Sequence, residues 1–255
     1  MKNLSFTGNL NRDYDLLVKF SNNTLQSTKS FIKDSQNIRK FHYSLFTLRD
    51  LIQQFQNISV YNEHELLQDF SILISSLNYV LRGDSFAAMA VARPAMELMP
   101  KILLHERHEV PTKSFSNNLD KCMSLIKKQY IQVLRINRTN AKEHFNSKIN
   151  EFTSHSKTLY WYISDYTHVS NEELLTEKDL LELFLVDHPM SQETISNSDM
   201  VLNTLISVTN FCKELLILDS LVLVTDTINP ELLRLYTKNS AEQYTDIQKY
   251  ILTKI

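Results

Sequence analysis

The sequence predicts an all-α fold, a single bundle of about eight to nine helices, from its low glycine content and its apolar periodicity. The chain has 255 residues but only two glycines and five prolines. Folds rich in tight hairpin turns need more glycine, because such turns require residues that tolerate positive φ. With 43% hydrophobic residues, the chain can bury one large core, so we expect a single domain over residues 1–255.

The first half of the chain contains four helical patterns. Residues 1–12 are polar, and we expect them to be loosely attached. Apolar residues then recur at three-to-four spacing over residues 14–32, 41–56 and 63–81. Gly83 can take the left-handed conformation that closes a helix, and Asp84 or Ser85 would cap the next one. That fourth helix should end near the loop at 107–118.

The second half continues the helical pattern and ends in long helices. We expect helices over about 117–135, 139–162, 191–225 and 230–250. The segment 166–189 is ambiguous, because its apolar run "LLELFLV" is compatible with a short strand or a helical turn. No internal repeat or interdomain linker is visible in the sequence.

Arg93 and Glu97 are the only charged residues in the apolar stretch 86–100. Their spacing of four places both side chains on one face of a helix, where they can pair. We expect this helix to lie at the centre of the bundle, where an unpaired charge is costly. Two interpretations stay open: an internal salt bridge that fixes helix register, or the floor of a polar cleft. In the cleft, Arg93 would hold an anion and Glu97 would orient it or move a proton.

The segment 160–170, "YWYISDYTHVS", contains the only tryptophan and three tyrosines. Ser164, Asp165 and His168 fall within about one helical turn of one another. An imidazole beside a carboxylate is a candidate acid-base pair, because the carboxylate fixes the tautomer and raises the proton affinity. A structural role for His168 is the alternative, since histidine near a helix C-terminus also interacts with the last carbonyls.

These two stretches together resemble uncharacterised bacterial HEPN-like helical proteins. The resemblance covers about residues 60–225 and rests on an Arg-x-x-x-Glu helix, an aromatic-rich Ser-x-x-x-His helix end and a long closing helix. It implies a HEPN-like core and a part in a bacterial defence or toxin-antitoxin system that senses or acts on nucleic acid or nucleotides. Carried over to this chain, it points to Arg93, Glu97, Ser164 and His168.

The resemblance also raises an RNA-cleaving toxin as a further alternative. Active ribonucleases of this group use an arginine and a histidine a few residues apart on one helix, and "RTNAKEH" offers Arg138 and His144. A match of this kind is expected about once by chance in such a chain. Its place near a predicted helix boundary departs from the family pattern. Whether the chain is an enzyme at all stays open.

Residues 113–148 form a basic segment with interleaved aromatic rings at Phe115, Tyr130 and Phe145. Clustered cations can neutralise phosphates, and exposed rings can stack on bases. The candidate binding residues are Lys127, Lys128, Arg135, Tyr130, Ser164 and Asp165. Residues 172–231 are acidic, so pairing of the two segments within the fold or across a homodimer is the alternative.

Other classes of protein are disfavoured by the sequence. It contains no P-loop, dinucleotide fingerprint or nucleophile elbow, so we expect no cofactor. His105 and His108 lack a second ligand cluster, so we expect no metal site. Cys122 and Cys212 do not form a disulfide framework, and the start of the chain lacks a leader pattern. We therefore expect a cytoplasmic protein with reduced thiols.

Two further expectations concern a membrane and a protein partner. The apolar stretches 86–100 and 215–224 are shorter than the roughly 20 residues that cross a membrane, so we expect no membrane association. The remaining alternative to a nucleic-acid protein is a noncatalytic interaction or regulatory module that binds a partner protein. In that case the buried charges would only specify packing.

Overall fold

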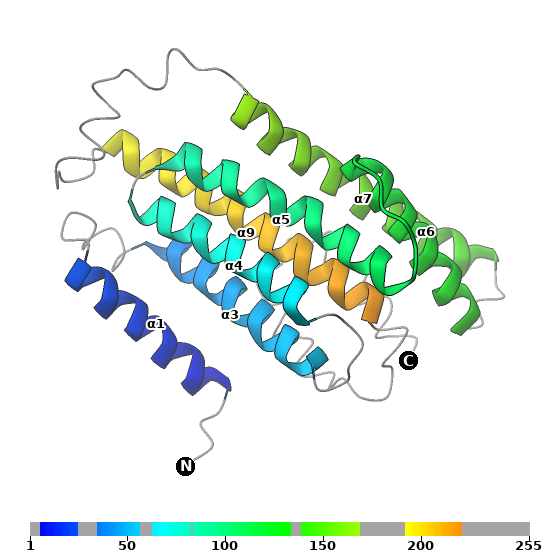
Figure 1. The fold of residues 1–255 in the computed structure, drawn as a ribbon, viewed down its shortest axis with the longest axis horizontal. Coiled ribbons are helices and arrows are strands. Elements are labelled where there is room, and N and C mark those ends of the chain that lie inside the picture. Colours follow the sequence, from blue (N-terminus) through cyan, green and yellow to red (C-terminus); the bar gives the residue numbers. More distant parts are fainter. Residues whose placement is uncertain are drawn as a thin grey trace.

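The computed structural model describes residues 6–24, 35–56, 63–82, 84–133, 139–168 and 192–220. These residues form seven helices and no strand, so the all-α prediction is confirmed for the described part of the chain (Figure 1). The helices are α1 (Phe6–Thr24), α3 (Gln36–Gln56), α4 (Glu63–Leu81), α5 (Ser85–Glu106), α6 (Phe115–Val133), α7 (Thr139–His168) and α9 (Gln192–Ser220). The ambiguous segment beyond His168 and the helix expected over 230–250 lie outside the described residues.

Local signals place several helix boundaries correctly. The bounds of α4 are those predicted, and the helix before the loop at 107–118 ends at Glu106. Asp84 caps α5, since its Oδ1 accepts a hydrogen bond from the backbone N–H of Ala87 at 2.8 Å. α1 begins at Phe6, so part of the segment 1–12 is helical, and the Phe6 ring packs edge-on against Phe46 of α3 at 5.5 Å.

α9 lies at the centre of the bundle and contacts α3, α4, α5 and α7 (Figure 1). Every side chain from Val208 to Asp219 is buried. We expected α5 at the centre of the bundle, and it likewise contacts four helices, α4, α6, α7 and α9. α5 nevertheless keeps an exposed edge that includes Phe86 and Pro94. Both helices are apolar on most sides, as is typical of helices buried in the core of a bundle.

The stretch Ser198–Asp219 is long and apolar enough to cross a membrane, with a mean hydropathy of 1.4. It corrects the expectation that no sufficiently long apolar stretch exists. However, 83% of the stretch is buried inside the bundle, and the core helix of a soluble protein passes the same test. The helix also contains the charged residues Lys213, Glu214 and Asp219, all buried against neighbouring helices.

Ionisable groups of α9 are buried against groups of the surrounding helices. Lys213 is fully buried, and its Nζ donates a hydrogen bond to Thr47 Oγ1 of α3 at 3.3 Å. Burial lowers the pKa of Lys213 to about 8, although the charge of Glu214 acts in the opposite direction. Asp69 of α4 is fully buried beside Cys212, and burial raises its pKa well above the usual value. These groups make the interior around α9 sensitive to pH.

Polar contacts also join α5 and α9, at the C-terminal end of both helices and within them. Arg107, the C-cap of α5, forms an ion pair with Asp219, whose side chain is 3% exposed. Cys212 lies beside the Ala95 carbonyl of α5, with 3.9 Å between sulfur and oxygen. Both cysteines, Cys122 and Cys212, are buried free thiols, as the sequence predicts.

Candidate functional site

Arg93 and Glu97 of α5 meet Tyr160 of α7 in a closed hydrogen-bond network. Arg93 donates from Nε to Glu97 Oε1 at 3.1 Å and from Nη2 to the Tyr160 hydroxyl at 3.2 Å. The same hydroxyl donates to Glu97 Oε1 at 2.8 Å. The predicted pairing of Arg93 with Glu97 is therefore confirmed. Tyr160, which sequence reasoning did not single out, is the third member.

The network lies at the edge of the helix contact rather than deep in the core. The side chains of Arg93 and Glu97 are 27% and 28% exposed, so the expectation of a deeply buried charge pair is wrong. Water reaches both groups and screens their attraction. This position is compatible with a polar cleft, because the guanidinium remains accessible from one side.

Two groups of the network keep their protons at neutral pH. Burial opposes the charged form of Arg93, but its contacts with Tyr160 and Glu97 outweigh burial and raise the pKa of the guanidinium. Burial, together with the hydrogen bond to Glu97, raises the pKa of the Tyr160 hydroxyl. The network is therefore a cation and a neutral phenol arranged around a carboxylate oxygen.

The ring of Tyr160, like its hydroxyl, is held by contacts with neighbouring helices. Phe115 of α6 stacks on it with ring centroids 4.3 Å apart and an interplanar angle of 20°. The Arg93 guanidinium carbon lies 5.5 Å from the same ring centroid. Because one buried side chain is held at its ring and its hydroxyl, the rotation of α7 about its axis is fixed.

In this orientation of α7, the side chains of Trp161 and Tyr162 face solvent. Trp161 is 56% exposed and Tyr162 is 43% exposed. The Tyr162 hydroxyl lies 3.5 Å from Met200 Sδ of α9, and Met200 is 40% exposed. We call Trp161, Tyr162 and Met200 the aromatic patch. It places large apolar side chains on the surface of α7 and α9.

The predicted site residues Ser164, Asp165 and His168 lie further along α7 than Tyr160. Ser164 is buried and Asp165 is exposed, so the two side chains lie on different faces of α7. His168 ends α7, eight residues beyond Tyr160, which is about 12 Å along the helix axis. Its side chain lies outside the described residues. The structure therefore joins Arg93 and Glu97 to Tyr160 and places the His168 backbone two turns away.

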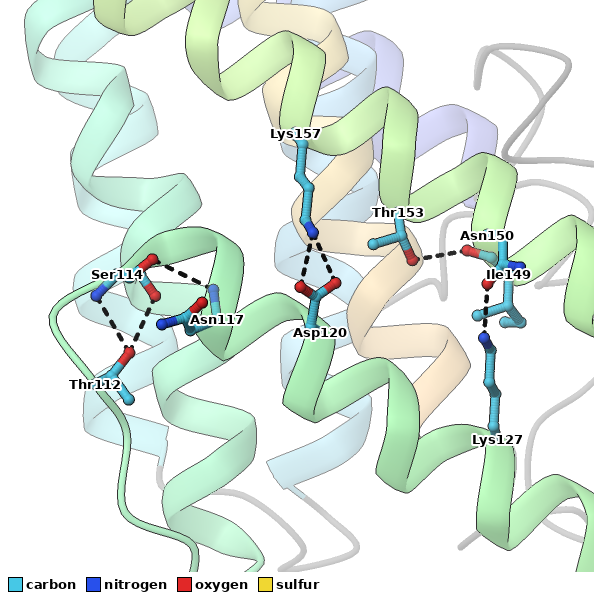
Figure 2. Close-up of polar contacts among 9 residues, drawn as sticks. All are labelled: Thr112, Ser114, Asn117, Asp120, Lys127, Ile149, Asn150, Thr153 and Lys157. Atoms are coloured by element: carbon cyan, nitrogen blue, oxygen red, sulfur yellow. Dashed lines mark hydrogen bonds and ion pairs between the residues drawn. The ribbon is translucent and has the colours of Figure 1, made fainter.

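Two lysines of α6 and α7 are engaged with polar groups of the neighbouring helix. Lys127 donates to Asn150 Oδ1 at 2.7 Å, and Lys157 of α7 donates to both carboxylate oxygens of Asp120 at 2.7 and 2.8 Å (Figure 2). Lys128 is exposed. Lys127 and Lys157 thus help to join these two helices, and the Asp120 carboxylate balances the charge of Lys157.

The aromatic rings of the basic segment are in the core, so the expectation that they stack on bases is wrong. Phe115, Tyr130 and Phe145 are 3%, 2% and 0% exposed. The Tyr130 hydroxyl donates to the Leu218 carbonyl of α9 at 2.7 Å. A tyrosine at the inner edge of an amphipathic helix can bury its ring when its hydroxyl finds an acceptor. That acceptor is remote in sequence.

Several other predicted site residues lie at the limits of the described structure. Arg135 and Arg138 lie outside the described residues. His144 belongs to α7, which begins at Thr139, but its side chain is outside the description. Within the described helices, no group of three or more His, Cys, Asp or Glu side chains is placed to hold a metal ion.

Comparison of the chain with known protein families, with curated proteins and with solved structures found no match. The HEPN-like resemblance therefore stays a prediction from the residues that carry it.

Proposed function

We propose that the protein is a noncatalytic interaction module that binds a partner protein through the aromatic patch. The observation that carries this proposal is the exposure of the only tryptophan, Trp161, next to the clamped Tyr160. Tryptophan and tyrosine contribute much of the binding energy at protein interfaces. A rigid helix also lowers the entropy that is lost on binding. The proposal includes a cytoplasmic location.

The Arg93–Glu97–Tyr160 network supports a positioning role rather than proton transfer. General acid-base catalysis is most efficient when the pKa of the catalytic group is near the working pH. The pKa values of Arg93 and Tyr160 are both raised, away from neutrality. In this proposal the network holds α7 against α5, and the aromatic patch makes the contact with the partner.

The experiment is cross-linking and mass spectrometry of the tagged chain in its native cells. Three versions are compared: the wild type, Trp161→Ala, and Tyr79→Ala as a matched control. Tyr79 is an aromatic residue on α4 that is 36% exposed. We expect Trp161→Ala to lose the cross-linked partner and Tyr79→Ala to retain it. Equal recovery of the partner with both variants would contradict the proposal.

A second candidate function is a HEPN-like defence protein, possessing a HEPN-like core, that senses or acts on nucleic acid or nucleotides. It is favoured by the charged guanidinium of Arg93, which is 27% exposed beside Glu97. In this candidate, Arg93 holds a phosphate, and a homodimer would bring two such clefts together. The RNA-cleaving alternative would instead use Arg138 and His144.

Growth of bacteria that express the chain separates these nucleic-acid candidates. Toxicity lost with Arg93→Ala but kept with His144→Ala supports the Arg93 cleft. Toxicity lost with His144→Ala supports the RNA-cleaving alternative. Thermal unfolding of each variant shows whether a lost effect reflects a lost fold. Absence of toxicity in the wild type, together with a Trp161-dependent partner, supports the interaction module.

A further inference from the structure

α1 and α3 enclose a partly open cavity of about 320 Å³ at one edge of the bundle. Figure 1 shows α1 beside α3, away from the central helix α9. The cavity has two arginines, Arg12 from α1 and Arg49 from α3, and two apolar residues, Leu16 and Phe46. Its volume is within the range of pockets that bind small molecules.

The carboxylates of this cavity are engaged by groups other than the arginines. Asp13 accepts a hydrogen bond from His42 Nε2 at 2.9 Å, and this nitrogen carries the proton because a carboxylate only accepts. Asp50 Oδ2 accepts from Gln54 Nε2 at 3.4 Å. Neither Arg12 nor Arg49 forms an ion pair with any residue that the structure describes. Two guanidinium groups thus line one cavity with donors available to a ligand.

The apolar residues give the cavity a second chemical character. Leu16 of α1 lines the cavity and is 56% exposed. Phe46 is half-buried, and the ring of Phe6 packs edge-on against it. A ligand with an apolar body would cover Leu16 and the exposed part of Phe46. This contact would remove apolar surface from water and so favour binding.

We propose that this cavity binds a small amphiphilic oxyanion, a carboxylate or phosphate group attached to an apolar body. Arg12 and Arg49 hold the oxyanion, because the planar guanidinium fork matches the geometry of carboxylate and phosphate oxygens. Leu16 and Phe46 pack on the apolar body. This site lies on helices other than those of the aromatic patch, so it does not depend on the proposed function.

The test is isothermal titration calorimetry of the full chain with phenyl phosphate, phenylacetate and inorganic phosphate. We expect at least one aromatic anion to bind more tightly than inorganic phosphate. Arg12→Gln and Arg49→Gln should each weaken that binding by about tenfold or more, as loss of a charge-assisted hydrogen bond does. Arg82→Gln is the matched control, since Arg82 is an exposed arginine at the end of α4. It should leave the affinity unchanged.

Each outcome of the titration decides the proposal. Tighter binding of phenyl phosphate identifies a phosphate ligand, and tighter binding of phenylacetate identifies a carboxylate ligand. No binding of either aromatic anion at millimolar concentration overturns the proposal, as does unchanged affinity in Arg12→Gln and Arg49→Gln. Inorganic phosphate that binds as tightly as the aromatic anions overturns the role of Leu16 and Phe46. Circular dichroism melting of the variants verifies that they are folded.

Discussion

Tyr160 donates a hydrogen bond to Glu97 at 2.8 Å, and this contact joins residues 63 positions apart in the sequence. The same hydroxyl accepts from Arg93, and the ring stacks on Phe115. One side chain of α7 is thereby fixed by α5 and α6. The direct consequence is the orientation of the neighbouring Trp161, which lies on the outer surface.

Tyr160→Phe removes the hydroxyl and keeps the ring on Phe115. We expect the free energy of unfolding to fall by about 1 kcal/mol, the usual effect of one lost hydrogen bond. The loss stays small because Arg93 and Glu97 still pair with each other and are reached by water. Urea denaturation measures it. Tyr162→Phe is the control, with an expected change within about 0.5 kcal/mol. An equal loss in both variants would argue against an anchoring role for Tyr160.

Asp219→Asn tests the ion pair between α5 and α9. Removing one partner of a buried pair typically costs about 3–5 kcal/mol, because Arg107 is left with an uncompensated charge. The matched control is Asp120→Asn, whose carboxylate pairs with Lys157 but is 54% exposed. Surface pairs contribute only about 0–1 kcal/mol. Chemical denaturation should therefore separate the two variants clearly, and similar losses would mean that the Arg107–Asp219 pair is not buried.

Lys213 gives the stability of the protein a specific alkaline dependence. Its pKa is lowered from 10.5 to about 8, first by burial, so the unfolded chain binds this proton more tightly than the folded protein. Between these two values the contribution of Lys213 to stability therefore rises with pH. We expect the free energy of unfolding of the wild type to rise relative to Lys213→Met over this window.

The control for this effect is Lys128→Met, which removes an exposed lysine of α6. The difference between this variant and the wild type should stay constant with pH. Each variant is compared with the wild type at the same pH, because buried tyrosines and thiols also titrate in alkali. Their raised pKa values make the free energy of unfolding fall as the pH rises. A constant difference for Lys213→Met would show that Lys213 is solvated in the folded protein.

The burial of Asp69 makes the free energy of unfolding depend on pH in the acid range. Burial raises its pKa well above 3.8, so the folded protein binds this proton more tightly than the unfolded chain does. Its cost to stability is absent below pH 3.8 and grows as the pH rises through this value toward the raised pKa. We therefore expect Asp69→Asn to be more stable than the wild type at neutral pH, with the gap narrowing on acidification. Asp165→Asn, at an exposed position of α7, should show no such trend.

Local features of the fold could be predicted from the sequence, because they depend on residues a few positions apart. The bounds of α4 follow from apolar spacing, and the Asp84 cap follows from residue type at a helix start. The pairing of Arg93 with Glu97 follows from their spacing of four on one helix.

Contacts between distant segments could not be predicted in the same way. The partnership of Tyr160 with Glu97 depends on how α7 packs against α5, and no local pattern encodes that register. The ring of Tyr130 lies in the core because its hydroxyl reaches the Leu218 carbonyl, whereas the sequence alone is equally compatible with an exposed ring. The set of helices that surrounds α9 likewise depends on packing between segments distant in the sequence.

Fluorescence of the single tryptophan tests the proposed interface, since Trp161 must lie on the surface to bind a partner. The measurement is iodide quenching of the native chain, compared with the same chain unfolded in urea. We expect strong quenching in the native state, close to that of the unfolded chain, because Trp161 is 56% exposed. A native emission protected from iodide would place Trp161 in the interior and contradict the proposed interface.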